Sequence, residues 1–540
     1  MFHTALWGSW QFAVDNATKN GDRLELRYAY GGWQEGQGPS DTRSSGAAFL
    51  ENVFEELDAA GEWYFDPAEQ QLYLLPNSSL PALQAAELAV PVLDSIVVIS
   101  GSQASASSYA SSISFSGFTF TETRSTFLEQ YEAPSSGDWT VFRSGSLFIQ
   151  DAENVTVAGC TFDQTGGTAL ALSNHVLGSL VADCEFVRTG ESGVIMLGST
   201  QGQNASLPTY PDRNTVARCH CHETGVYGKQ TSCVASLLAA NTSILDTVAY
   251  NSPRAALNDV DGFGGGKHYS GNVVFNNVRE TGDHGPLNTW MRMPYLSFSG
   301  NADGFNRSDG LSIVKAWDEV KANLVINGYS GVWASDRDDA SQFVRDNGNF
   351  FLWGGCKNFR GCWKECDDNV ILSVQDSSRH PLDVRDGSPL SPPPSIPLSL
   401  RDPLCRRYPG TASRSHGAQP CQGSYVGNGN SEHVGNVCAT ANGVSYAWAG
   451  CDTRPNSVNG SVYYTALNTH LVDAGADFNV SCGDPQVQLG FAQWQALAQD
   501  GGSSTSATPD VAALIALGAA KVLGGRGGSG GAAASTLSLV

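Results

Sequence analysis

The chain has 540 residues, enough to bury a large core, and a formal net charge of −22. Only 16% of its residues are charged, 41% are hydrophobic and 60 are glycine, which is a globular, turn-rich composition and excludes a disordered chain. Phosphate backbones repel so acidic a protein, so nucleic acid is excluded as a partner. No stretch is apolar enough to span a bilayer, so no membrane partner is expected.

Residues 1–100 are predicted to form an N-terminal β-rich region. Residues 24–28, 62–66 and 71–75 alternate polar and apolar side chains and are separated by turn residues. Such alternation over short runs is typical of half-buried strands.

A short pattern then repeats through the central part of the chain. Each copy is a short alternating strand that ends in Thr or Ser, followed by Gly or Pro. Successive copies begin at Cys160, Cys184, Cys219, Thr247 and Asn276, with spacings of 24, 35, 28 and 29 residues. Repeats of this size, without helical periodicity, predict a β-solenoid with loops inserted in the longer copies.

Residues 101–380 are therefore predicted to be the solenoid core, with stacked parallel rungs from 113 to 330. Two columns of side chains should face inward, one made of Phe118, Cys160, Cys184 and Cys219, the other of Phe120, Phe162, Phe186 and Cys221. Residues 381–420 form a Pro/Arg-rich insertion or linker, and 421–500 further rungs. Thr508 and Pro509 open a short apolar helix through Leu523, within a segment 501–540 that ends in a disordered tail.

The 13 cysteines and eight Asn-X-Ser/Thr sites predict a secreted glycoprotein with disulfide bonds. The N-terminus has no signal-peptide pattern, so we expect the true beginning of the natural protein to be missing from this chain. Cys219-His220-Cys221-His222 could indicate a metal site. Alternate residues of a strand face opposite sides, so these four should not converge, and no metal is expected.

The segment 279–295 carries candidate catalytic chemistry. Asp283 beside His284 is a plausible acid/base pair at the point where a Gly-rich turn leaves the solenoid. Trp290 and Tyr295 offer flat faces for sugar rings, and Arg292 has donors for hydroxyl or carboxylate groups.

The segment 333–341 is the second candidate. Asp336, Asp338 and Asp339 repel one another, so the cluster needs a cation or a carboxyl group with a raised pKa. An ordinary solvated turn is the alternative interpretation, but Trp317 and Trp333 bracket the cluster. Neighbouring rungs can hold two carboxylates at the 5–9.5 Å that glycosidases use. A third candidate, 259–268, ends in His268 and has glycines suited to a turn beside a groove.

Three motifs resemble right-handed β-helix proteins related to glycoside hydrolase family 141. They are residues 51–73, the Gly-Asp-His-Gly-Pro run from Gly282, and the Asp-X-Asp-Asp run from Asp336. The similarity covers residues 1 to about 375 and resumes at 490–495. The resemblance implies an all-β, pectin-lyase-like, right-handed parallel β-helix with acidic catalytic residues, in a family whose activities include α-L-fucosidase and xylanase.

We therefore expect an extracellular, monomeric glycoside hydrolase that acts on a polysaccharide or other glycan without a cofactor. Asp336 or Asp339 is one catalytic carboxylate and Asp283 the other, with His284 and Arg292 orienting the sugar. Further substrate contacts are predicted from Asp338, Trp290, Tyr295, Trp317, Trp333 and His268.

Two alternatives stay open. A polysaccharide lyase or epimerase on the same fold would use calcium and a basic residue, for which Lys267, Lys315 and Arg292 are candidates. An inactive wall or matrix protein would bind glycan through Trp and Tyr without turnover.

Overall fold

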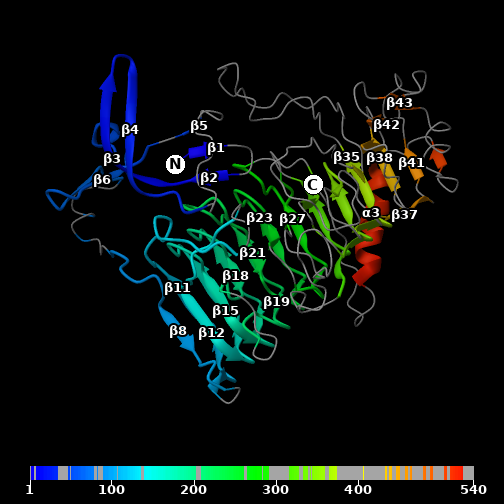
Figure 1. Ribbon diagram of the computed structural model, residues 1–540, viewed down its shortest axis with the longest axis horizontal. Helices are drawn as coiled ribbons and strands as arrows, with labels where there is room; N and C mark the ends of the chain where they lie inside the picture. The colour runs from blue at the N-terminus through cyan, green and yellow to red at the C-terminus, as the bar shows by residue number, and fades with distance from the viewer. Residues whose placement is uncertain are drawn as a thin grey trace, which may run out of the picture.

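Three long parallel sheets form the body of the protein (Figure 1). The computed structural model describes residues 2–4, 8–34, 47–48, 50–77, 82, 85, 89–105, 108–134, 139–201, 208–260, 264–281, 284–290, 316–327, 333–338, 341, 343–358 and 364–373. Beyond residue 373 it describes strands between 405 and 506 and one helix.

Sheet I contains β10 (Ser114–Ser116), β13 (Thr156–Ala158), β16 (Leu180–Ala182), β19 (Thr215–Ala217), β22 (Ser243–Leu245), β25 (His268–Ser270), β28 (Asp318–Lys321), β31 (Val344–Asn347), β34 (Lys364–Asp367), β37 (Glu432–Val434) and β40 (Ser457–Asn459). Sheet II contains β11 (Thr119–Thr121), β14 (Thr161–Asp163), β17 (Glu185–Val187), β20 (His220–His222), β23 (Val248–Tyr250), β26 (Val273–Phe275), β29 (Leu324–Ile326), β32 (Phe350–Leu352), β35 (Val370–Ser373), β38 (Val437–Thr440), β41 (Val462–Tyr464) and β44 (Ser504–Ser506).

Sheet III contains β8 (Val97–Ser100), β9 (Ala110–Ser111), β12 (Leu147–Glu153), β15 (Leu170–Leu177), β18 (Val194–Leu197), β21 (Val234–Leu237), β24 (Leu257–Val260), β27 (Leu287–Trp290), β30 (Ser335–Asp338), β33 (Cys356–Asn358) and β36 (Cys405–Arg406). The chain visits sheets I, II and III in turn, and each strand pairs in parallel with the equivalent strand of the next turn. The predicted right-handed parallel β-helix is therefore confirmed.

The interior is built from columns of identical or similar side chains, because pairing in register places equivalent residues of successive rungs side by side. The rings of Phe120, Phe162 and Phe186 stack at centroid distances of 4.7 and 5.0 Å, and Cys221 follows in register. Cys160, Cys184 and Cys219 are also buried, as predicted, and are free thiols.

Phe118 was wrongly predicted to be buried at the start of the cysteine column. Its side chain is 54% exposed, although its backbone carbonyl accepts a hydrogen bond from the next rung at Thr161. Strand β11 is the first strand of sheet II, and among the described residues no earlier strand of this sheet covers this end of the column.

The same column changes from cysteine and threonine to asparagine farther along the solenoid. Asn272, Asn323, Asn349 and Asn369 form a ladder in which each backbone N–H donates to the next side-chain Oδ1 at 2.8–3.0 Å. Each Nδ2 group also donates to a carbonyl of the preceding rung at 2.8–2.9 Å. The repeat after Thr247 therefore begins at Asn272, not at Asn276 as predicted, because Asn replaces Thr at this position.

Two disulfides close the interior in the described part of the chain. Cys221–Cys233 joins β20 to the residue before β21, and Cys356–Cys366 joins β33 of sheet III to β34 of sheet I. The prediction of disulfide bonds is confirmed by these two pairs.

The N-terminal region is antiparallel. It contains β1 (Phe2–Thr4), β2 (Gly8–Trp10) and β5 (Ala47–Ala48) in one sheet, the hairpins β3 (Phe12–Asn20)–β4 (Arg23–Gly31) and β6 (Trp63–Asp66)–β7 (Gln71–Leu74), and the 3₁₀ turn η1 (Phe54–Glu56). Side chains of Gln11 and Gln34 donate to the carbonyls of Tyr227 and Phe127, so this region packs onto the turns between sheets II and III.

At the other end, helix α3 (Val511–Arg526) lies against β32 and β35 of sheet II (Figure 1). Leu514 and Val522 pack on the outer faces of Leu324, Phe350 and Val370. A small separate sheet contains β39 (Tyr446–Ala449), β42 (Phe478–Ser481) and β43 (Val487–Leu489). Strand β42 pairs in parallel with β39 and antiparallel with β43. In the described part of the chain, no helix combines the length and apolar character that a bilayer crossing requires.

We expect Asn323→Ala to lower the free energy of unfolding by about 2–4 kcal/mol, because the buried amide of Asn272 and the carbonyl of Tyr269 lose their partners. Urea denaturation measures the loss. Asn347→Ala, at an exposed position on β31, is the control and should change stability by less than about 0.5 kcal/mol. Equal losses in the two variants would contradict a special role for the ladder.

Candidate active site

A polar row crosses the outer face of sheet III. Asn258, Asn288, Asp336 and Lys357 lie side by side on β24, β27, β30 and β33. Residues alternate between faces along a strand, and Leu257 beside Asn258 packs in the interior, so this row faces outward. The two predicted segments therefore lie on neighbouring rungs.

The row supplies the cation that the aspartate cluster needs. Lys357 Nζ lies 3.1 Å from Asp336 Oδ1 and 3.2 Å from Asp338 Oδ1. The same Nζ sits 4.2 Å from the ring centroid of Trp333, and Asn288 Nδ2 donates to Asp336 Oδ2 at 2.9 Å. One lysine thus offsets the repulsion between two carboxylates.

The spacing of these carboxylates has a chemical meaning. Their two Oδ1 atoms can be no farther apart than the sum of their distances to Lys357 Nζ. This upper limit is shorter than the roughly 6.5–9.5 Å that separates the two catalytic carboxyl groups of inverting glycosidases. It is compatible with the roughly 5–5.5 Å that separates them in retaining enzymes. Asp336 is fully buried, while the side chain of Asp338 keeps 25% of its surface exposed.

The turn before β27 packs directly against this pair. A Cβ atom on Gly285 would lie 2.5 Å from the carbonyl oxygen of Trp333 and 3.2 Å from Asp336 Cβ. Only glycine fits so close an approach. His284, one residue earlier in the same turn before β27, is also buried.

The structure brings Asp336, Asp338, Trp290 and Trp333 onto one side of sheet III. Both indoles are nearly buried, at 5% and 3% exposure, and Trp290 joins an apolar cluster that includes Val260 on the outer face. Their role as platforms for sugar rings stays a prediction.

Two predicted contact residues lie on another sheet. His268 is exposed on the outer face of β25 in sheet I, beside Glu319. Trp317 directly precedes β28 of the same sheet and carries the Arg345 guanidinium 4.0 Å above its ring. The structure does not place either residue with Asp336. Five other predicted residues lie outside the described part of the chain: Asp283, Arg292, Tyr295, Lys315 and Asp339.

The lyase candidate Lys267 lies inside the solenoid, where it does not face a substrate. Its Nζ pairs with Asp259, and its backbone N–H donates to Asp318 Oδ1 at 2.9 Å. Its side chain has no exposed surface. Residue 267 immediately precedes β25, and alternation with exposed His268 turns it inward.

Arg337 is also internal, because it alternates with the outward Asp336 and Asp338. Its guanidinium binds both oxygens of Asp346, at 3.0 and 2.7 Å, and its carbonyl accepts from Lys364 Nζ at 2.8 Å. Burial favours the neutral form, but the carboxylate of Asp346 outweighs it and raises the pKa of Arg337.

We expect Asp346→Ala to destabilise the fold by about 3–5 kcal/mol, because it leaves the buried charge of Arg337 uncompensated. Chemical denaturation tests this against Asp183→Ala, whose partner Arg218 is exposed and stays solvated. An Asp346→Ala protein as stable as the control would show that the internal ion pair is not needed for stability.

Sequence reasoning predicted His284 but missed the other three members of a row of polar residues at the turns before sheet III. Glu191, Thr231, Arg254 and His284 each lie three residues before strands that pair in register, β18, β21, β24 and β27. Arg254 lies over the Trp139 ring at 4.5 Å. A lone Glu in a Thr-Gly-Glu-Ser-Gly run offers no sequence signal for this position.

Glu191 is a buried acid. It accepts hydrogen bonds from Thr126 Oγ1, at 2.9 Å, and from the hydroxyl of Tyr131. Burial raises the pKa of Glu191 despite these bonds. The adjoining cavity of about 10 Å³ has room for a single water molecule, not for a sugar.

The raised pKa predicts a direction for stability with pH. Between the unfolded and folded pKa values of Glu191 the folded state holds a proton that the unfolded state lacks, so stability falls as pH rises through this window. Glu191→Gln removes this loss. Its stability relative to the unmodified protein should therefore increase from acidic to neutral pH, measured by urea denaturation at several pH values. A difference that is independent of pH would contradict a protonated Glu191.

A larger cavity, about 690 Å³, opens where residues 50–63 meet the turns 125–127 and 226–229. Trp63 and Tyr227 line it with exposed rings, and Glu51, Glu62 and Lys229 add charge. Its volume lies in the range of small-ligand sites.

No protein-family model matches the chain, and no curated protein matches its sequence. Among solved structures, a protein described as a glycoside hydrolase is similar at 15% identity and a TM-score of 0.47, over 68% of this chain and 66% of that one. XylC in complex with xylose is similar at 11% identity, TM-score 0.31, over 69% and 53% of the two chains. An E. coli bacteriophage tailspike protein in complex with a pentasaccharide is similar at 11% identity, TM-score 0.30, over 79% and 85%. This chain thus spans just under two thirds of the first structure and about half of the second.

Proposed function

We propose that the protein is a glycoside hydrolase that acts at the polar row of sheet III. The observation that carries the proposal is the pair of carboxylates, Asp336 and Asp338, which one lysine holds closer together than the inverting mechanism requires. Asn288 and Lys357 both stabilise the ionised form of Asp336, which suits it to attack the anomeric carbon.

The second carboxyl group must donate a proton to the leaving oxygen and then activate water. Asp338 has the required proximity and an exposed edge. Asp283, which lies outside the described residues, is the sequence-based candidate for the same role. Separate variants distinguish the two.

We expect Asp336→Asn to lower kcat by about 10³-fold or more on a confirmed substrate, because a neutral amide cannot attack the sugar. Asp338→Asn and Asp283→Asn distinguish the two candidates for the acid. Loss of the true acid should lower activity much less on substrates with good leaving groups, because these need no proton to depart. Substrates come from a panel of polysaccharides and nitrophenyl glycosides, with product analysis. Asp183→Asn, on an exposed turn of the opposite side, is the control and should retain full activity.

Full activity of both Asp336→Asn and Asp338→Asn would refute the assignment. A calcium-dependent, unsaturated product that absorbs ultraviolet light would instead identify a lyase. Binding without turnover across the panel would identify a glycan-binding protein. The 690 Å³ cavity with Trp63 and Tyr227 favours this last function, since exposed aromatic faces suit sugar rings.

We further propose an extracellular location. Two disulfides lie in the solenoid interior, and disulfides are typical of proteins folded in oxidising compartments. Glycosylation sites at Asn16 and Asn77 lie on exposed segments of the N-terminal region.

A further inference from the structure

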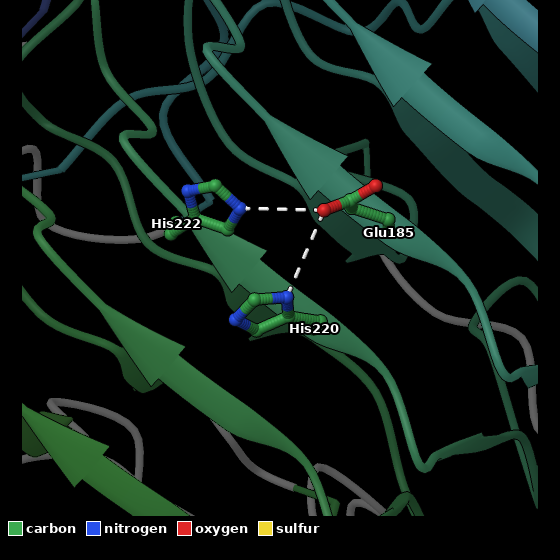
Figure 2. Close-up of side chains that lie close together, drawn as sticks. All are labelled: Glu185, His220 and His222. Atoms are coloured by element: carbon green, nitrogen blue, oxygen red, sulfur yellow. Dashed lines mark hydrogen bonds and ion pairs between the residues drawn. The ribbon is translucent and has the colours of Figure 1, made fainter.

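Two histidines and a glutamate converge on the outer face of sheet II, on rungs that precede those of the polar row of sheet III. Glu185 on β17 and His220 on β20 are directly paired, and His222 lies two residues further on the same face. Cys221 between the histidines points inward to its disulfide. Figure 2 shows both imidazole rings turned toward one carboxylate oxygen.

The distances fit a single metal ion. Glu185 Oε1 lies 3.5 Å from His222 Nε2 and 3.7 Å from His220 Nδ1, and the ligand atoms of all three residues lie within 4.8 Å of one another. Ligands about 2.0–2.2 Å from a tetrahedral zinc ion are about 3.3 Å apart, so only a small closure is required.

The orientation of His222 is fixed by its neighbours. Its Nδ1 donates to the Glu223 carboxylate, which can only accept, so in the neutral ring Nε2 is the atom without a proton. Asn251 Nδ2 donates to the other oxygen of Glu223, and Asn276 in turn donates to Asn251. The Tyr250 ring stacks on His222 at 4.9 Å with an interplanar angle of 2°.

In the neutral ring of His222 this arrangement leaves the Nε2 lone pair facing the Glu185 carboxylate oxygen at 3.5 Å, and a cation between the two atoms would bind both. A carboxylate that orients a metal-binding histidine is the usual outer partner in such sites.

We propose that Glu185, His220 and His222 bind one divalent transition-metal ion, with zinc as the metal of choice. Two imidazoles and one carboxylate select zinc, copper or nickel over calcium and magnesium, which prefer oxygen ligands. Three protein ligands leave the fourth position of a tetrahedral ion for water or a ligand atom. The site also links β17 to β20, so bound metal stabilises two successive rungs.

The test uses the full-length chain, freed of metal by a chelator and dialysed. Zinc titration by calorimetry, with metal analysis of the dialysed protein, should give one more bound zinc than in the His220→Ala/His222→Ala double variant. Zinc should raise the melting temperature of the unmodified protein and not that of the double variant. Glu223→Gln should weaken zinc binding by about 10–100-fold, as expected for loss of a partner that orients a ligand.

His268→Ala is the matched control, because it removes an exposed strand histidine from a different sheet. It should leave the affinity and the number of bound zinc ions unchanged. Cobalt substitution should give the visible absorption of a four-coordinate ion without a thiolate charge-transfer band, since Cys219 and Cys221 point inward. Equal circular dichroism of the metal-free proteins confirms that the variants fold.

Equal zinc affinity and stoichiometry in the double variant would overturn the proposal. So would the absence of zinc binding at micromolar concentrations, because His222 would then be bridged to Glu185 by a proton alone. Failure of this site leaves the hydrolase proposal untouched, since the two sites share no residue.

Discussion

The in-register stacking of rungs is the constraint on which the rest of this structure depends. A solenoid has few contacts between distant rungs, so each rung must pack and hydrogen-bond well with its two neighbours. At the corner between sheets I and II the asparagine ladder does this with side-chain amides that satisfy backbone groups of the adjacent rung on both sides. Sliding one coil by a single residue would leave these buried donors and acceptors unpaired and would turn every strand side chain to the opposite face.

Both candidate sites follow from that register. Alternation sends Asp336 and Asp338 outward and Arg337 inward on one strand, and it sends His220 and His222 outward and Cys221 inward on another. Pairing with the next coil then adds the missing partner, Lys357 in the first site and Glu185 in the second. In each case the chemistry comes from residues on adjacent coils, 19 to 37 positions apart in sequence, that a fixed spacing of about 4.8 Å brings together.

The sequence was sufficient for the fold because the phenylalanine and cysteine columns recur visibly, and apolar columns need only similar side chains at equivalent positions. The repeat pattern placed the copy after Thr247 four residues too late, because Asn272 replaces the Thr or Cys that begins the earlier copies. It failed at Phe118 because a repeat pattern does not show which coil is the first. Lys357 and Glu191 were missed for a different reason: each belongs to its site only through pairing across coils whose loops differ in length, and neither carries a local motif. The inward position of Arg337 was within reach of strand alternation, had residues 335–338 been recognised as a strand rather than a turn.

The interior is not uniform along the axis, and this makes the two ends respond differently to temperature. Coils around Phe120, Phe162 and Phe186 are filled with aromatic and aliphatic groups, whereas those around Asp259, Arg337 and Asp346 contain ion pairs. Apolar burial weakens on cooling, while the desolvation penalty of buried ions falls on warming. Cooling should therefore destabilise the aromatic rungs more than the rungs with ion pairs, and heating should destabilise the rungs with ion pairs least. Amide hydrogen exchange should accordingly be fastest in different rungs at low and at high temperature.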